Sequence, residues 1–92
     1  VLPAQTTVSD LVAGKDGEVY GGTYPGCRVF RYHPSSGFSD INNGAIVSGE
    51  SYARSLVYQP SSHKLYIGVG SHARLVEFNL TTKEKKEILP SQ

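Results

Sequence analysis

The sequence predicts an all-β fold built from two copies of one four-stranded antiparallel unit, and three observations carry this prediction. With 10 Gly, 5 Pro and 6 Tyr among 92 residues, the chain is rich in residues that break helices or suit strands. No window repeats apolar residues at the i, i+3, i+4 and i+7 positions of an amphipathic helix over three turns. The third observation is an internal repeat, which makes a periodic architecture the first hypothesis to consider.

The repeat relates the two halves of the chain at an offset of 45 to 46 residues. Leu11-Val12 recurs 45 positions later as Leu56-Val57, and after one residue is gained in a turn, the stretch 28–32 falls on 74–78 at an offset of 46. Both copies share the order apolar pair, polar turn, strand with Tyr, Gly-rich loop, Arg, alternating strand and Ser/Thr turn. This shared order argues against chance similarity between two β-rich halves.

The first copy is expected to form four strands. They are predicted at Ser9–Ala13, Glu18–Gly22, Arg28–His33 and Phe38–Asn42. The turn Gly14–Gly17 contains Asp-Gly, which supplies the positive φ that a tight hairpin needs.

The second copy is expected to repeat these elements. Its strands are predicted at Arg54–Tyr58, Lys64–Gly68, Arg74–Asn79 and Lys83–Leu89. The stretch Thr81 to Ile88 is the only place where a helix competes, and we favour the solvated outer strand of a sheet there.

Four antiparallel strands with a period of about 40–50 residues are the signature of a β-propeller blade. The chain 1–92 is therefore predicted to be part of one propeller domain, with blade one at 8–45 and blade two at 50–89. Two blades cannot close a ring of about 4–8 blades. We expect the chain to be part of a larger propeller, of seven blades, or of an oligomeric ring. The remaining blades would come from a second polypeptide or from copies of this chain.

Four stretches carry a resemblance to known propellers, namely 17–23, 28–37, 64–70 and 75–82. A strand ending Tyr-x-Gly followed by an apolar-x-aromatic strand and a Ser/Thr turn resembles kelch, NHL and quinoprotein-like blades. The segments 21–26 and 68–73 further resemble the propellers of secreted, uronate-acting polysaccharide lyases. This resemblance implies a secreted, carbohydrate-active protein that cleaves next to a uronate by β-elimination.

The blade topology gathers three arginines at one rim, where the loops after the second and fourth strands of each unit lie. Arg28, Arg54 and Arg74 are the predicted substrate-binding residues, because guanidinium groups bind carboxylates in a bidentate manner. In the alternative interpretation each arginine pairs with an acid between blades. The available acids are Asp10, Glu50 and Glu77.

Three residues at the same rim are predicted to be catalytic. His72 lies in a Gly-Ser-His-Ala loop and can move a proton near neutral pH, although it could instead hydrogen-bond a neighbouring blade. Tyr24 and Tyr52 lie in loops without a repeat partner, which suits sugar stacking or proton transfer. His33 and His63 fall on the opposite face and are expected to be solvated turn residues.

Two function classes remain open. One is the lyase; the other is a non-catalytic propeller that binds a sugar or a protein through the same loops. We predict no metal and no cofactor, because Cys27 and three scattered histidines have no ligand spacing. A net charge of +1 and the absence of an apolar run near 18 residues predict neither nucleic-acid nor membrane binding.

Other features bear on where the protein works. Asn79-Leu80-Thr81 is a glycosylation sequon in an expected turn, which favours secretion. The opening residues 1–5 do not form a signal peptide, so a secreted protein would already have lost one. Cys27 is expected to be a free buried thiol or to pair with a cysteine elsewhere.

A blade pair also leaves two sheet faces uncovered. We therefore expect the chain to be unstable as an isolated monomer. The apolar residues expected on these faces are Leu11, Val29, Leu56 and Leu75.

Overall fold

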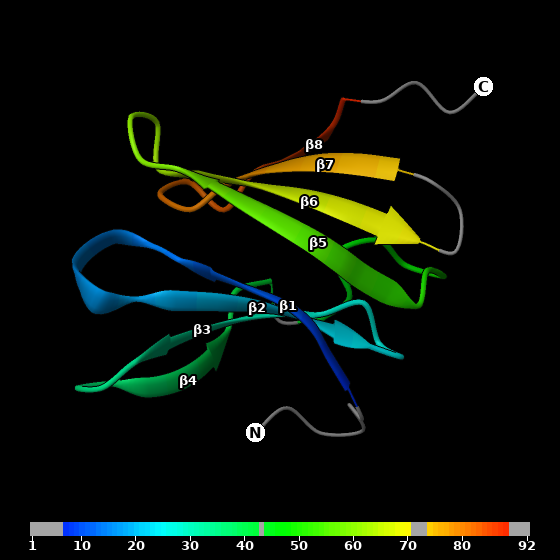
Figure 1. Ribbon diagram of the computed structural model, residues 1–92. Helices are drawn as coiled ribbons and strands as arrows, with labels where there is room; N and C mark the ends of the chain where they lie inside the picture. Colours follow the sequence, from blue (N-terminus) through cyan, green and yellow to red (C-terminus); the bar gives the residue numbers. More distant parts are fainter. Residues whose placement is uncertain (1–6, 43, 71–73, 89–92) are drawn as a thin grey trace.

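The computed structural model describes residues 7–42, 44–70 and 74–88, which form two four-stranded antiparallel sheets (Figure 1). The first sheet contains β1 (Thr7–Ala13), β2 (Val19–Tyr24), β3 (Val29–His33) and β4 (Gly37–Asp40). The second sheet contains β5 (Tyr52–Gln59), β6 (Lys64–Gly70), β7 (Arg74–Asn79) and β8 (Lys85–Glu87). In each sheet the strands follow one another in chain order. The predicted all-β fold with two four-stranded units is confirmed.

The turns follow local backbone chemistry. Between β1 and β2 the chain makes a 3-10 turn at Lys15–Gly17, in which Asp16 and Gly17 have φ angles of 57° and 83°. The positive φ predicted for Asp-Gly is therefore confirmed. In the stretch where a helix competed, β8 is a strand, but it is shorter than predicted because the turn after Asn79 runs through Lys83, whose φ is 67°.

Both sheets have a bulge at the same repeat position. The pairing of β1 with β2 shifts register between Val8 and Asp10, and that of β5 with β6 shifts between Ala53 and Ser55. These positions lie 45 residues apart, which is the sequence offset of the repeat. Since a bulge increases local twist and bends the strand, the two units share backbone shape as well as strand order.

The two sheets pack face to face, with β5 lying across β1 and β2 (Figure 1). Apolar residues from both sheets fill the space between them, and the rings of Tyr20 and Tyr58 stack there with centroids 6.0 Å apart. Gly22 allows this approach, because a Cβ at this position would collide with the backbone carbonyl of Ala53. Burial of this surface is the main source of stability for the pair.

Asp10 links the sheets by a polar contact as well. Its Oδ2 accepts a hydrogen bond of 2.9 Å from the backbone N–H of Leu56, and its Oδ1 accepts one of 2.9 Å from that of Leu11. Both donors follow a bulge. The carboxylate thus satisfies one N–H in each sheet.

The connection between the sheets folds back into the space where they diverge. Ile41 and Ile46 of this segment are buried, and the Ile46 N–H donates to the carbonyl of Cys27 over 2.7 Å. Cys27 is fully buried, which confirms the expected burial of this thiol.

The expected exposure of four apolar residues requires correction. Leu11 is 58% exposed and Leu75 is half-buried, but Val29 is fully buried and Leu56 is only 4% exposed. Val29 and Leu56 point into the space between the sheets, so each sheet covers one face of the other.

Candidate functional site

Tyr24 and Tyr52, from different sheets, meet at one end of the molecule. The ring centroids are 4.4 Å apart with an angle of 22° between the planes, and the Cζ of Arg54 lies 5.0 Å from the centroid of Tyr52. We call Tyr24, Tyr52 and Arg54 the rim cluster. Three predicted site residues are therefore brought together.

Backbone contacts fix the position of the rim cluster. The N–H of Cys27 donates to the carbonyl of Ser51 over 2.9 Å, which ties the loop after β2 to the start of β5. Within the second sheet, Tyr52 pairs with Gly70. Arg54 lies at the β5 bulge, its side chain is exposed, and in the described residues it has no ion-pair partner. Its guanidinium group is thus available to an anionic ligand.

Arg28 is engaged in an ion pair. Its Nη1 lies 2.7 Å from the Oδ2 of Asp40, and the side chains are 31% and 11% exposed. Arg28 is paired with an acid, but not between the two units as the alternative interpretation expected, because Asp40 belongs to the same sheet and was not among the expected acids. Asp40 is the last residue of β4 and pairs with Phe30. The predicted strand, Phe38–Asn42, extended two residues further and would have placed Asp40 in its middle.

Arg74, at the start of β7, is also engaged in ion pairs. Its Nη1 donates to both carboxylate oxygens of Glu87 at 3.0 and 3.1 Å, and its Nε lies 3.3 Å from the Oε2 of Glu50. The pairing with Glu50 was one of the expected alternatives. Among the described residues, Arg54 is the one of these three arginines for which no ion-pair partner is found.

The remaining predicted site residues have different outcomes. His72 lies outside the described residues. Asn79 begins the turn after β7, where its Oδ1 accepts N–H bonds of 2.9 and 3.0 Å from Thr81 and Thr82. The sequon therefore lies in a turn, as expected.

The two turn histidines are held rather than freely solvated. The Nε2 of His33 lies 3.0 Å from the carbonyl of Asp16, and the Nδ1 of His63 lies 2.8 Å from the hydroxyl of Tyr58. Each histidine braces a neighbouring turn or strand, which corrects the expectation of solvated residues.

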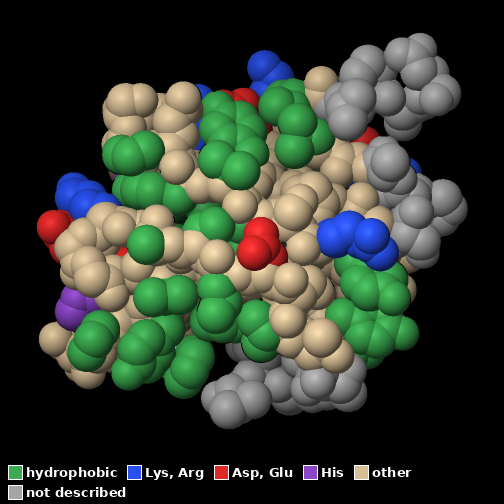
Figure 2. All heavy atoms as spheres, in the orientation of Figure 1, with side chains coloured by type: hydrophobic (Ala, Val, Ile, Leu, Met, Phe, Trp, Pro, Cys, Tyr) green, Lys and Arg blue, Asp and Glu red, His purple; other side chains and the backbone are tan. Residues whose placement is uncertain are grey.

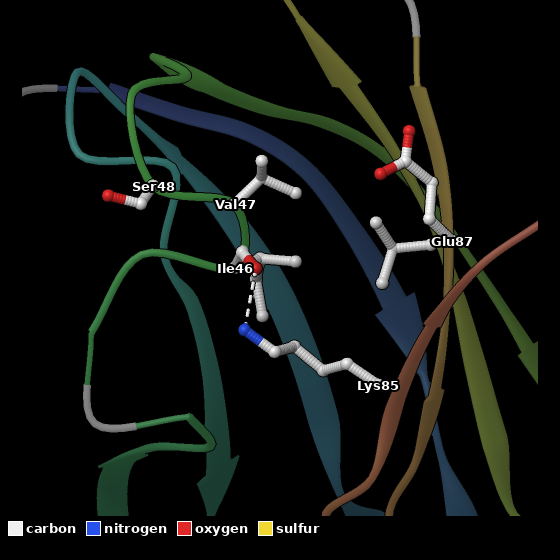
Figure 3. A pocket seen from close by; sticks show the side chains of 6 residues that line it. Ile46, Val47, Ser48, Lys85 and Glu87 are labelled. Carbon is white, nitrogen blue, oxygen red and sulfur yellow. Dashed lines mark hydrogen bonds between the residues drawn. The ribbon is translucent and has the colours of Figure 1, made fainter. Parts of the chain in front are cut away.

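A shallow pocket of about 260 Å³ lies between the inter-sheet connection and β7–β8 (Figure 3). Its lining is mixed in polarity, and the Nζ of Lys85 donates to the carbonyl of Ile46 over 2.9 Å beside it. The lining residues are Ile46, Val47, Ser48, Val76, Lys85 and Glu87. This pocket could not be predicted from the sequence, because it depends on how the connection between the sheets folds back.

Sequence reasoning also missed an ionic cluster on the covered side of the first sheet. Glu18 accepts 2.8 Å hydrogen bonds from the Nε of Arg31 and the hydroxyl of Tyr20. Burial alone would raise the pKa of Glu18, but these hydrogen bonds outweigh it, and the net pKa lies below its usual value. Burial, followed by the bond to Glu18, raises the pKa of Tyr20, which therefore remains a neutral donor.

The second sheet carries the same cluster with its charges exchanged. The Nζ of Lys64 lies 2.7 Å from the Oε2 of Glu77, which also accepts a 3.3 Å bond from Tyr66. The hydrogen bond from Lys64 lowers the pKa of Glu77. An exchange of Glu18/Arg31 for Lys64/Glu77 at the offset of 46 was the sequence signal available for both clusters.

Within the described ranges, no group of three or more His, Cys, Asp or Glu residues could hold a metal ion. No helix among them is long and apolar enough to cross a membrane. No protein-family model, curated protein or solved structure matches the chain significantly.

Proposed function

We propose that the chain is a two-blade portion of a secreted β-propeller that binds a uronate-bearing polysaccharide at its rim. The propeller arrangement is supported by two repeat-related antiparallel sheets that pack face to face, with their first strands side by side. Other blades, from a second polypeptide or from copies of the chain, complete the ring. Glycosylation at Asn79 would accord with secretion.

The observation that carries the saccharide proposal is the rim cluster. Arg54 is an exposed guanidinium held over the ring of Tyr52, and the ring of Tyr24 stacks against that of Tyr52. A guanidinium binds a sugar carboxylate through two parallel hydrogen bonds. The tyrosines supply amphipathic surface and hydroxyl groups for the sugar ring.

Calorimetric binding of an oligouronate to the assembled protein tests this proposal. We expect Arg54→Ala to weaken binding by about tenfold or more, as the loss of a charged hydrogen-bonding partner does. Arg54→Lys should restore part of the affinity, because it keeps the charge and loses the planar fork. Lys83→Ala is the matched control, since Lys83 is an exposed cation in the turn after β7. Equal affinity for the wild type and Arg54→Ala would refute the proposed site.

The second candidate function is β-elimination from the bound uronate. A base removes the proton next to the carboxylate, the bond to the leaving oxygen breaks, and an acid protonates that oxygen. The observation that favours this chemistry is the pair of tyrosines beside the free guanidinium, which would neutralise the carboxylate. His72 is proposed from the sequence as a further proton-transfer residue.

Elimination is read from the ultraviolet absorbance of the unsaturated uronate product. If His72 transfers a proton, His72→Ala should lower turnover by roughly 10²–10⁴-fold with much less effect on binding. His63→Ala is its control, because His63 lies in the turn between β5 and β6. Oligouronate binding without any product would leave the binding module as the function.

A further inference from the structure

Each sheet has one face covered by the other sheet and one free face. Because paired residues point to the same side of a sheet, the register assigns the faces. The apolar part of the free face of the first sheet contains Val8, Leu11, Val19, Phe30, Tyr32 and Phe38, and Asp40 lies at its end. The free face of the second sheet contains Ser55, Val57, Tyr66, Gly68 and Leu75, together with the ion pair of Lys64 and Glu77.

The free face of the first sheet is a large apolar surface. Val8, Leu11 and Phe38 are 52%, 58% and 53% exposed, and the Phe38 ring contacts those of Phe30 and Tyr32 at centroid distances of 5.4 and 4.7 Å. In Figure 2, hydrophobic side chains gather over the region where Figure 1 shows β3 and β4. An apolar patch of this kind marks a surface that another protein covers.

The repeat shows which kind of surface fits this face. At the offset of the repeat, Leu11 corresponds to Leu56 and Val8 to Ala53, and both counterparts are buried against the first sheet. The free face of the first sheet thus corresponds, by repeat position, to the covered face of the second sheet. Within the chain, the covered face of the second sheet packs against the covered face of the first sheet, which we call its inner side.

The free face of the second sheet matches that inner side. Val57, which is 61% exposed, corresponds to Val12, which packs against the core. Leu75 corresponds to the fully buried Val29. The two free faces therefore have the same relationship to each other as the two faces already packed together.

A glycine strengthens this correspondence. Gly68 is the counterpart of Gly22, where the backbone of β5 comes too close for a side chain. Gly68 does not have a positive φ, so its backbone conformation does not require glycine. A Cβ at Gly68 would contact the side chain of Ser55, which belongs to the same sheet. A glycine within a strand marks a site of close backbone approach. At Gly68 that approach would come from another molecule.

We propose that copies of this chain associate head to tail, with the free face of the second sheet packing on the free face of the first sheet of the next copy. The contact reproduces the packing between sheets within the chain and places Val8 of one copy over Gly68 of the other. It is heterologous, because each face fits the other and not itself. The inference rests on the proposed blade arrangement but not on the saccharide site.

Sedimentation velocity of the 92-residue chain and two variants tests this inference. Leu11→Glu places a charge on one free face, and Val57→Glu places one on the other. The wild type should associate in a concentration-dependent manner, whereas each variant alone should weaken association by about tenfold or more. A mixture of the two variants should form a heterodimer and grow no further. Leu11→Glu keeps the free face of the second sheet intact and Val57→Glu keeps that of the first sheet, so the mixture offers only one intact pair of faces.

Three results would overturn the inference. They are a wild type that stays monomeric, a single variant that associates as strongly as the wild type, or a mixture that forms no heterodimer. Circular dichroism checks that each variant is folded, and the milder pair Leu11→Thr and Val57→Thr must show the same pattern. Ser36→Glu, at an exposed turn position, is the control and should associate like the wild type. A chain that binds the oligouronate but never associates would refute this inference alone.

Discussion

The two sheets have the same strand order, the same bulge and related sequences, yet equivalent residues lie in opposite environments. Leu56 is 4% exposed, whereas Leu11, at the same repeat position, is 58% exposed. Val57 is 61% exposed, whereas its counterpart Val12 packs against the core. The repeat determines the strands, and the neighbouring sheet determines which side of each strand is buried.

The ionic clusters of the two sheets also occupy equivalent repeat positions in different environments. Both keep a tyrosine beside an ion pair, but the acid of the first sheet, Glu18, directly precedes β2, whereas the acid of the second sheet, Glu77, lies on β7. Pairing across neighbouring strands is preserved when both partners change sign. The position thus requires a pair of opposite charges rather than a particular residue.

The largest expected contrast is between the two leucines. Leu56→Ala should lower the free energy of unfolding by about 2–5 kcal/mol, because it leaves a cavity between the sheets. Leu11→Ala should change it by no more than about 0.5 kcal/mol in the monomer. Urea denaturation at low and high protein concentration measures both. If copies associate as proposed, the cost of Leu11→Ala should rise with concentration, and equal costs for both leucines under all conditions would contradict the comparison.

The two glycines give the next contrast. Gly22→Ala should cost about 1–3 kcal/mol, since the added methyl collides with backbone that cannot rotate away. Gly68→Ala should cost less in the monomer, because the side chain of Ser55 can move. Thermal unfolding followed by circular dichroism compares them. A larger loss for Gly68→Ala in dilute solution would show that the inter-sheet approach at Gly22 is not a determinant of stability.

The inter-sheet contact of Asp10 allows a third test. Asp10→Ala should destabilise the chain by about 1–3 kcal/mol, because the N–H of Leu56 loses its acceptor. Ser55→Ala, at the equivalent exposed position, should change stability by no more than about 0.5 kcal/mol. Amide hydrogen exchange should also show faster exchange at Leu56 in Asp10→Ala. Unchanged exchange there would rule out this hydrogen bond as a link between the sheets.

The smallest contrast concerns pH. Since the pKa values of Glu18 and Glu77 lie below their usual value in the folded chain, both carboxylates stabilise the fold above the ordinary glutamate pKa of about 4.3. This stabilisation is lost as the pH falls through the lower, folded pKa. Glu18→Gln should flatten the acid limb of a stability–pH profile more than Glu77→Gln, because Glu18 lies between the sheets. A larger effect of Glu77→Gln than of Glu18→Gln would show that the cluster on the free face contributes more to stability than the one between the sheets.

Much of the fold could be predicted because it depends on local signals. The Asp-Gly turn and the alternation in each strand gave the right strand order, and the third strand of the second copy, Arg74–Asn79, has the predicted bounds. The burial of Val29 and Leu56 could not be predicted from one copy at a time. Their environment depends on the contact between the sheets, which periodicity within a strand does not describe.

The grouping of the candidate site residues could be predicted only in part, for a similar reason. The repeat topology placed Tyr24, Tyr52 and Arg54 at one end, and the structure brings them together. The partners of Arg28 and Arg74 were harder to predict, because Asp40 and Glu87 lie on short outer strands whose register sets the pairing. The pocket beside Lys85 depends on the inter-sheet connection, which has no regular pattern.

The outer strands also determine how this protein avoids uncontrolled association. β4 and β8 have four and three residues, and all of β8 (Lys85–Glu87) is exposed and charged. Short edge strands, and lysine-bearing ones such as β8, are poor templates for strand addition, the route by which sheets grow into amyloid-like fibrils. Growth by strand addition is therefore discouraged at the β4 and β8 edges, so at this side of the molecule stacking of sheet faces is the favoured route of association.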